Sequence, residues 1–333
     1  MLTKLKDENR LLLTVPLKPL QGDRFQPTGF PSLGAATYQT KTGTKLLVES
    51  TQSMANRLEA TCWDFAQNKP VGDLEGISHV TVTRNQQFLT DSMLEAHRIN
   101  SPYLLEGKKD TTFKDLLKKE LGGLEEGPID RKKLTAVLLR YDVGSLIHGV
   151  FLAKSELAGG RLRISRALSA FIEASGASVA ASGGVKNDHV NPSGDTKTGF
   201  GNVPFPRDEY VADNIHLYVN LDLSQIRGYG LSAQVENLLV LLSLYRVRKL
   251  LDSDLRLRTS CDLMPLNSDI IAERPNGFRL PPFGDLQKAV KAAIAECKGE
   301  MIHTTVTYED ELKKGKAQDE ATGEDDSDNE TDD

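Results

Sequence analysis

The sequence predicts a mixed α/β or α+β sandwich, for which a ferredoxin-like or RRM-like sheet is one of several good fits. Two observations support this. Stretches that alternate apolar and polar residues interleave with helical stretches along the chain, a pattern typical of two packed layers. Residues 215–223 alternate at the period of a half-buried strand, and residues 231–251 predict a long, largely apolar helix. Glycine-rich segments divide the rest, so the core is rich in insertions.

The N-terminal elements are a strand, a loop and a helix. Residues 11–17 predict a first strand, and residues 21–31 form a loop rich in turn formers. The spacing in residues 46–63 predicts an amphipathic helix, since Leu47, Thr51, Met54, Leu58 and Cys62 fall on one stripe at about 100° per residue. Its opposite face carries uncharged polar side chains in place of the usual Lys/Glu pairs.

The middle and C-terminal segments predict further elements and two insertions. We expect strands at residues 77–83, 134–141, 255–261 and 301–308, and helices at 112–121, 163–175 and 285–297. Residues 64–130 read as an inserted lobe. Residues 183–206 contain paired glycines and three prolines without hydrophobic periodicity, so a protruding hairpin or a flexible loop is expected there.

The charge distribution separates a mildly basic body from an acidic tail. Residues 1–316 carry 41 Lys and Arg against 38 Asp and Glu, whereas residues 317–333 carry nine acidic and no basic side chains. A tail of this composition cannot bury enough apolar surface to order itself, so residues 311–333 are expected to be disordered. The first apolar run is too short for a signal sequence or a membrane span, which favours a cytoplasmic protein.

The sequence lacks the usual motifs of catalysis and metal binding. Neither a phosphate-binding glycine motif nor a nucleophile elbow nor a metalloprotease motif occurs. The three cysteines are far apart and predict buried thiols rather than a disulfide or zinc site. We therefore expect no cofactor or metal. The six histidines are scattered, and His148, between glycines after an apolar run, is the best acid–base candidate.

Nucleic-acid binding is predicted to act through the sugar-phosphate backbone. The first strand has no aromatic residues for stacking bases, and aromatics make up only 6% of the chain. Uncharged donors and arginines suit phosphate contacts. The candidates in the loop and on the helix are Lys18, Gln21, Arg24, Gln26, Thr28, Gln52, Ser53, Asn56 and Arg57. A second cluster comprises Arg161, Arg163 and Arg166, and weaker candidates in the glycine-rich segment are Lys186, His189 and Lys197.

Two long blocks carry a resemblance to a known family. They are PLKPLQGDRFQPTGFP at residues 16–31 and LLVESTQSMANRLE at residues 46–59. The combination resembles the Csb-type RAMP proteins, the backbone subunit of the type I-G (formerly I-U) CRISPR Cascade complex in antiviral defence. The resemblance extends over most of residues 10–310.

This resemblance implies an α+β fold with an RRM-like (ferredoxin-like) palm, inserted lobes and a protruding β-hairpin thumb. The palm would be residues 1–63 and 131–310, the lobe 64–130 and the thumb 183–206. Carried over by position, it implies that Ser50, Gln52, Ser53, Asn56 and Arg57, with Arg24 and Gln26, grip the guide RNA.

The resemblance also implies partners and a division of labour. Copies would stack head to tail along one CRISPR RNA, together with target DNA, a large subunit, a processing or cap subunit and a recruited helicase-nuclease. Guide pairing would supply sequence specificity, so the protein need only hold shape and charge. We therefore expect a binding subunit rather than an enzyme.

Two alternatives remain open from the sequence. A RAMP-fold endoribonuclease could process precursor CRISPR RNA without metal, with His148 as general base. A small-molecule enzyme could use residues 176–207 as an active-site lid.

Overall fold

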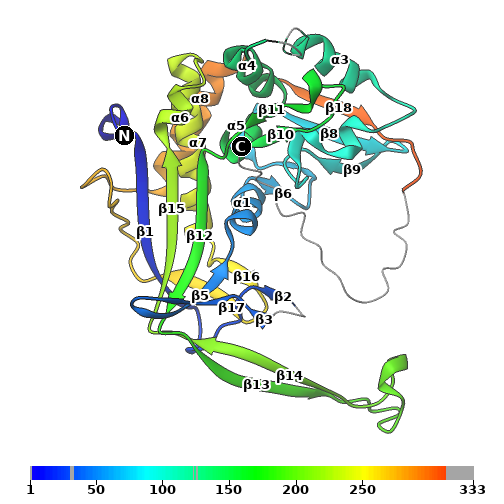
Figure 1. Cartoon of the computed structure of the whole chain (residues 1–333), viewed down its shortest axis with the longest axis vertical. Helices are drawn as coiled ribbons and strands as arrows, with labels where there is room; N and C mark the ends of the chain where they lie inside the picture. Colours follow the sequence, from blue (N-terminus) through cyan, green and yellow to red (C-terminus); the bar gives the residue numbers. More distant parts are fainter. Residues whose placement is uncertain (1, 31–33, 123, 125–126, 313–333) are drawn as a thin grey trace.

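Figure 1 shows the computed structural model, which describes residues 2–30, 34–122, 124 and 127–312. A seven-stranded sheet of antiparallel pairs lies at its centre, in the order β16-β17-β1-β15-β12-β5-β4. The strands are β1 (Arg10–Pro19), β4 (Thr37–Thr40), β5 (Gly43–Glu49), β12 (Leu168–Ser175), β15 (Asn214–Asp222), β16 (Arg256–Arg258) and β17 (Cys261–Pro265). The predicted α+β class is confirmed. The tail expected at 311–333 lies, from residue 313 on, outside the described residues.

Two crossovers connect the central strands through helices. Between β1 and β12 the chain forms β4, β5, α1 (Thr51–Ala60) and a lobe, and between β15 and β17 it forms α6 (Leu223–Arg227) and α7 (Ala233–Leu251). Burial alternates along β1, β12 and β15, because successive side chains of a strand point to opposite faces. The helices cover the buried face of the sheet (Figure 1).

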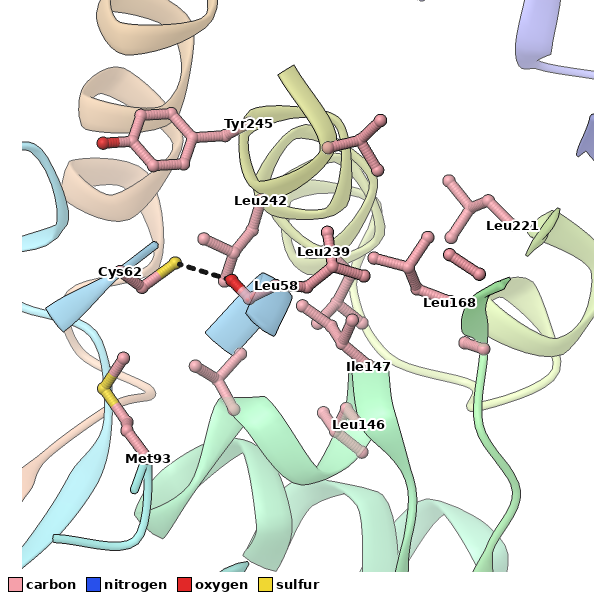
Figure 2. Close-up of a cluster of buried hydrophobic side chains, with 14 of the residues drawn as sticks. Leu58, Cys62, Met93, Leu146, Ile147, Leu168, Leu221, Leu239, Leu242 and Tyr245 are labelled. Atoms are coloured by element: carbon pink, nitrogen blue, oxygen red, sulfur yellow. Dashed lines mark hydrogen bonds between the residues drawn. The ribbon is translucent and has the colours of Figure 1, made fainter. Parts of the chain in front are cut away.

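The core lies between these helices and the sheet. Figure 2 shows Leu58 of α1 and Leu239 of α7 close to Leu168 and Leu221 of the sheet. Each of these side chains is at most 1% exposed, which contributes about 2 kcal/mol of burial free energy per residue. The three cysteines are free and buried, as their spacing predicts.

A lobe packs beside the sheet and has small sheets of its own. Strand β8 (His79–Arg84) pairs antiparallel with β9 (Gln87–Asp91) and parallel with β18 (His303–Thr307), so the lobe includes residues outside the expected range 64–130. Its other elements are β6 (Trp63–Asp64), β7 (Lys69–Pro70), α2 (Pro102–Leu105), α3 (Thr112–Leu121), α4 (Arg131–Tyr141), α5 (Val143–His148), β10 (Val150–Leu152) and β11 (Leu162–Ile164). The remaining elements are β2 (Gly29–Phe30), β3 (Gly34–Ala35), α8 (Phe283–Cys297) and the 3-10 turns η1 (Thr3–Leu5), η2 (Gly72–Leu74), η3 (Arg98–Asn100), η4 (Ala158–Gly160) and η5 (Thr196–Thr198).

A long hairpin projects from the end of the central sheet (Figure 1). Its strands β13 (Ser178–Lys186) and β14 (Val203–Val211) pair antiparallel along their whole length, from Ser178 opposite Val211 to Lys186 opposite Val203. The chain enters it directly from β12 and leaves it directly into β15. The hairpin therefore extends two neighbouring strands of the sheet and begins five residues before the predicted 183.

Two predicted elements are of the wrong type. Residues 134–141 were expected as a strand but lie in helix α4, whose exposed stripe is Lys132, Ala136 and Arg140; because Ala136 is apolar, the run from Leu134 to Leu139 shows little polar interruption and its helical period is hidden. Its start is marked by Asp130, which accepts a hydrogen bond from the Lys133 amide at 3.0 Å. Residues 163–175 were expected as a helix but form β11 and β12, where burial alternates at every second residue.

The predicted helix 46–63 is shorter than expected. Its first residues belong to β5, and α1 begins at Thr51, because the Ser50 hydroxyl caps the helix by accepting from the Ser53 amide at 3.2 Å. Met54, Leu58 and Cys62 form the buried stripe, as predicted. The predicted strands 11–17 and 301–308 and the helices 112–121, 231–251 and 285–297 are confirmed within a few residues.

Candidate nucleic-acid interface

A cavity of about 820 Å³ lies where α1 meets η3, α5, β10 and β11, and we call it the arginine cavity. Three arginines and two histidines line it, and none of the described residues of its wall is an Asp or Glu. A concave surface with cationic side chains and no carboxylates attracts anions. Its polar lining residues are Gln52, His97, Arg98, Asn100, His148, Arg163, Ser165 and Arg166.

One wall of the arginine cavity is the β10–β11 pair. Phe151 and Arg163 lie directly opposite one another in the antiparallel register, and both side chains face outward. The Phe151 ring is 55% exposed. Within the described residues, no side-chain hydrogen bond or ion pair engages Arg163. Gly149, at φ +81°, lets the start of β10 lie close to the end of β11, because a Cβ there would lie 2.8 Å from the carbonyl oxygen of Ile164.

Arg166 joins this wall to α1. Its Nη2 donates to Oε1 of Gln52 at 2.6 Å, and its Nε donates to the carbonyl oxygen of His148 at 3.3 Å. The Gln52 side chain, at the exposed face of α1, is therefore in direct contact with the second predicted arginine cluster. Two groups of candidates that are far apart in the sequence meet in one place.

The floor of the arginine cavity contains a buried ion pair. Nη2 and Nε of Arg98 donate to the two carboxylate oxygens of Glu59 at 2.6 and 2.8 Å. Burial raises the pKa of Glu59, and the charge of Arg98 opposes that rise. Arg98 has a backbone φ of +50°, a conformation that is strained for a residue with a side chain. The ion pair holds it in place.

A further buried arginine lies behind this pair. Arg246 of α7 is 1% exposed, and its Nε and Nη1 have no hydrogen-bond partner among the described residues. Nearby Asp142 is fully buried, which raises the pKa of its carboxyl group. Glu59 therefore feels the charges of both Arg98 and Arg246, and Asp142 feels the charge of Arg98.

His148, at the end of α5, is 1% exposed, and neither ring nitrogen has a hydrogen-bond partner among the described residues. Burial holds the pKa of His148 well below its usual range, and the positive charges of Arg246, Arg98 and Arg166 lower it further. The ring is therefore neutral at pH 7, with one donor and one acceptor nitrogen.

A second charged group, the Glu49 cluster, lies on the other side of α1 and consists of Glu49, Ser53, Arg57 and Arg258. The fully buried carboxylate of Glu49 accepts from the Ser53 hydroxyl and from Nε of Arg57 at 2.7 Å, and it pairs with Arg258. The two arginines also donate to backbone carbonyls. The donors of Ser53 and Arg57 are thus used inside the protein, and Ser50 caps the helix.

Comparison with known proteins adds the family. A sequence model of the family of CRISPR-associated protein GSU0053 matches residues 11–179. The chain belongs to this family. Comparison with curated proteins finds no match.

Two solved structures resemble the GSU0053-family chain distantly. One is a chain of a CRISPR RNA-guided surveillance complex, described as pre-nicking, at 15% identity and a TM-score of 0.39, covering 77% of this chain and 73% of that one. The other is Csc2 of Thermofilum pendens, at 9% identity and a TM-score of 0.34, covering 89% of this chain and 79% of that one.

The loop candidates of the GSU0053-family chain lie away from the arginine cavity. Gln21 and Arg24 line a separate cavity of about 310 Å³ together with Asp23, Glu209 and Asp262. Arg24 pairs with Glu209 at 3.5 Å. A phosphate in that cavity would meet three carboxylates. The loop cavity is therefore a poor phosphate site.

Two other loop candidates have structural contacts. Oε1 of Gln26 accepts from Nε of Arg207 at 2.7 Å and so ties the loop to the hairpin strand β14, and the Thr28 amide donates to the Val48 carbonyl oxygen at 3.0 Å. Lys18 is exposed near the end of β1.

The remaining candidates are distributed over the lobe and the hairpin. Nη2 of Arg161 donates to the carbonyl oxygens of Leu124 and Gly127 at 2.6 and 3.0 Å, so the donors of this arginine are used inside the lobe. Lys186, His189 and Lys197 are exposed along the hairpin, at the far end of the molecule from β10 and β11 (Figure 1).

Several residues of the arginine cavity escaped prediction from the sequence. Phe151, His97, Arg98 and Asn100 belong to segments that gave no regular pattern. The available signal was that Phe151 lies close in sequence to the second arginine cluster. That signal places Phe151 next to Arg163 only once β10 and β11 are known to pair.

Proposed function

We propose that this chain is an RNA-binding backbone subunit of a CRISPR effector complex, which polymerises along the guide RNA and supports pairing of the guide with target DNA. Its family is CRISPR-associated. The observation that carries the proposal is the arginine cavity, which brings Arg163 and Arg166 together with Gln52 of α1 in a wall without carboxylates. Arginine and amide donors suit the sugar-phosphate backbone, which carries no sequence information.

The RNA path that we propose follows the exposed face of α1. Gln52 and Asn56 are exposed and lie one helical turn apart, so they form a continuous row of neutral donors that leads to Arg166. Neutral donors and a few arginines would hold the phosphates of any sequence. Such binding is steeply salt-dependent, because neutralised phosphates release counterions.

We assign the central sheet to an RRM-like palm and the hairpin to a thumb. The strands β17, β1, β15 and β12 are neighbours in that order, with helical crossovers after the first and third strands along the chain. This is the βαββαβ connection of a ferredoxin-like sheet. The hairpin extends well beyond the body, which suits a segment that reaches a neighbouring copy (Figure 1).

The partners proposed here follow from the type I-G assignment. They are copies of the same chain stacked head to tail, the CRISPR RNA, target DNA, a large subunit, a processing or cap subunit and a recruited helicase-nuclease, all in the cytoplasm. A heterologous interface that does not close gives a filament, whose length the RNA and its cap would limit. None of the described helices is both long enough and apolar enough to cross a membrane.

Catalysis is not part of this proposal, but the endoribonuclease alternative has one observation in its favour. His148 lines the arginine cavity with both ring nitrogens unpartnered among the described residues. A general base works best with a pKa near the working pH, whereas that of His148 is well below its usual range. Incubation of the pure protein with labelled precursor RNA without metal distinguishes the two functions, because a binding subunit leaves the RNA intact.

The lid proposed for a small-molecule enzyme does not fit the hairpin. The segment 176–207 belongs to a ribbon that projects away from the body and does not line the arginine cavity.

The main test measures binding of three unrelated single-stranded RNAs by fluorescence anisotropy over a series of salt concentrations. We expect similar affinities for all three and a steep common salt dependence. A strong preference for one sequence, or no binding to any, would contradict the proposal. The absorbance ratio at 260 and 280 nm of the purified protein adds an early indication of bound nucleic acid.

A further inference from the structure

Residues 317–333, which we call the acidic segment, concentrate negative charge at one end of the sequence. They carry nine Asp and Glu and no Lys or Arg, and all nine lie between Asp319 and Asp333. Residues 1–316 carry 41 basic and 38 acidic side chains, so the net charges of the two parts have opposite signs. Blocks of like charge often serve as interaction segments for a surface of the opposite charge.

The last described residues fix the place from which the acidic segment starts. The Lys108 amide donates to Oδ2 of Asp310 at 2.7 Å. The ring of Tyr308 packs edge-on against that of Tyr103 in α2, with the two ring centroids 5.3 Å apart. These contacts anchor residues 308–310 on the lobe, next to the loop that follows α2.

The wall of the arginine cavity is close to this anchor. Ala153 lines the cavity, and the next residue, Lys154, forms an ion pair with Glu106, which lies two residues before Lys108. One ion pair and a few residues therefore separate the cavity from the anchor. The 21 residues from 313 to 333 can extend up to about 70 Å, so the acidic segment can reach the cavity without any change in the described fold.

The arginine cavity presents positive charge that the described residues leave open to a ligand. Arg163 is exposed, and no side-chain hydrogen bond or ion pair engages it within the described residues. Arg166 donates to a neutral amide and to a carbonyl oxygen. Arginine binds carboxylates through the same charge-assisted, often bidentate hydrogen bonds that it forms with phosphates. A chain of carboxylates is therefore a ligand of the same kind as an RNA backbone.

We propose that the acidic segment occupies the arginine cavity when no RNA is bound, so that RNA has to displace it. This inference rests on the proposed RNA-binding function and adds regulation of the same site. A segment tethered next to its site has an effective concentration of about 1 mM. Even a weak contact, with a dissociation constant of about 0.1 mM, then lowers the apparent affinity for RNA about tenfold. A guide RNA that also follows α1 gains contacts that the segment lacks, and it displaces the segment.

The test compares RNA binding by the full chain with that by two variants. One variant replaces the nine Asp and Glu of residues 319–333 by Asn and Gln and keeps the length of the chain, and the other ends at Lys316. Binding of one single-stranded RNA is measured by fluorescence anisotropy. We expect both variants to bind RNA about tenfold more tightly than the full chain at low salt. The difference should shrink as added salt screens the charges.

Removing nine negative charges also weakens a general repulsion of RNA, so a control must tie the effect to the cavity. Combined with Arg163→Ala/Arg166→Ala, neutralisation of the acidic segment should no longer improve RNA binding. The matched control is Lys186→Ala/Lys197→Ala, which removes two exposed cations of the hairpin that do not line the cavity. In that background the tenfold gain should remain. An equal gain in both backgrounds would show general repulsion and overturn the proposal.

The outcomes separate this inference from the proposed function. If the variant with the neutral segment binds RNA as the full chain does, the acidic segment is only solvated, and the inference is wrong while the RNA-binding function stands. If RNA binds neither the full chain nor the chain that ends at Lys316, the proposed function fails and the competition fails with it. RNA binding that is detected only after removal of the segment would support both.

A second readout follows the acidic segment directly. Ser327→Cys places a reactive thiol in the segment, since the three native cysteines are buried, and a benzophenone attached to this thiol is activated by light. We expect crosslinks to peptides from residues 150–166 within a single chain, and their loss when RNA is added. Crosslinks to other surfaces, or between two chains, would place the segment elsewhere and contradict the proposal.

Discussion

Two groups of arginines flank α1, and they differ in how their charge is balanced. In the Glu49 cluster, two arginines share one fully buried carboxylate and direct their other donors to backbone carbonyls. In and behind the arginine cavity, only Arg98 forms an ion pair with Glu59; Arg166 and Arg246 are near enough to feel its charge, and Arg163 has no ion pair among the described residues. Nitrogens of Arg246 have no partner among the described residues. The first group is complete within the protein, and the second is not.

This difference shows that an arginine in a polar stretch of sequence is a good candidate for binding only if its donors are not already used by partners inside the folded protein. By sequence, Arg57 was the better candidate, because it belonged to the first cluster and to the set implied by the resemblance, whereas Arg166 belonged to the second cluster. The structure gives Arg57 a carboxylate and two carbonyls, whereas Arg166 reaches an exposed amide at the mouth of a cavity. The following tests separate a structural role from a binding role, beginning with the largest expected effect.

The largest effect is expected on stability, from Glu49→Gln. The change keeps the shape of the side chain but leaves Arg57 and Arg258 without a carboxylate. Breaking a buried ion pair from one side costs about 3 kcal/mol or more in the free energy of unfolding. Urea denaturation followed by circular dichroism measures it. Glu156→Gln, at a half-exposed carboxylate of the lobe, serves as the control and should leave the midpoint unchanged.

The second test moves to RNA binding and compares Arg163→Ala/Arg166→Ala with Arg57→Ala. The double variant removes two phosphate contacts, so the slope of log affinity against log salt should become shallower by about 1.4. Arg57→Ala should lower the free energy of unfolding, while its folded fraction keeps the wild-type slope. If Arg57→Ala makes the slope shallower and the double variant does not, the roles of the two arginine groups are reversed.

The third test replaces residues 187–202 at the hairpin tip with Asn-Gly. The tip adds little to the core, and loop-closure entropy changes slowly with length, so the melting temperature should hardly move. Assembly on a guide RNA, followed by native gel and electron microscopy, should be disrupted if the hairpin contacts the next copy. Full assembly and target capture by the shortened protein would rule out the thumb role.

The smallest effect on stability is expected at the exposed face of α1. Gln52→Ala and Asn56→Ala should each change the free energy of unfolding by no more than about 0.5 kcal/mol, yet RNA retention should fall several-fold. Ser53→Ala provides the contrast, since its hydroxyl donates to buried Glu49 and its loss should destabilise the fold. If a variant that combines Gln52→Ala and Asn56→Ala retains RNA as the wild type does, the RNA does not follow this face of α1.

Much of the fold could be predicted because its strongest patterns are local. The alternation of β15 and the long apolar helix α7 are visible in the sequence, and their bounds agree within a few residues. The errors fall where the residue types hide the period. The exposed face of helix α4 includes an alanine, Ala136, so its apolar run resembles a strand, and β12 contains residues that also favour helices.

The candidate site was predicted only in part, because its side chains contact partners that lie far away along the sequence. Gln52, Arg163 and Arg166 were named from their residue types. Their convergence depends on the β10–β11 pair and on the position of α1, neither of which a residue pattern contains. Glu49 lies only four residues before Ser53, but its burial and its pairing with Arg258, far along the chain, become visible only in the folded protein.

The exposed strands of the hairpin affect how the protein behaves when many copies lie close together. In the part of the chain that the structure describes, β13 and β14 pair with each other and, apart from a bridge between Tyr210 and Phe25, present two open edges. Open edges invite strands of other molecules to add on. Opposite Gly183 stands Pro206, and opposite Val185 stands Pro204, so β14 lacks two backbone donors near the glycines, which themselves disfavour strand formation. The composition of the ribbon therefore resists fusion into a continuous intermolecular sheet, even where many copies are held side by side.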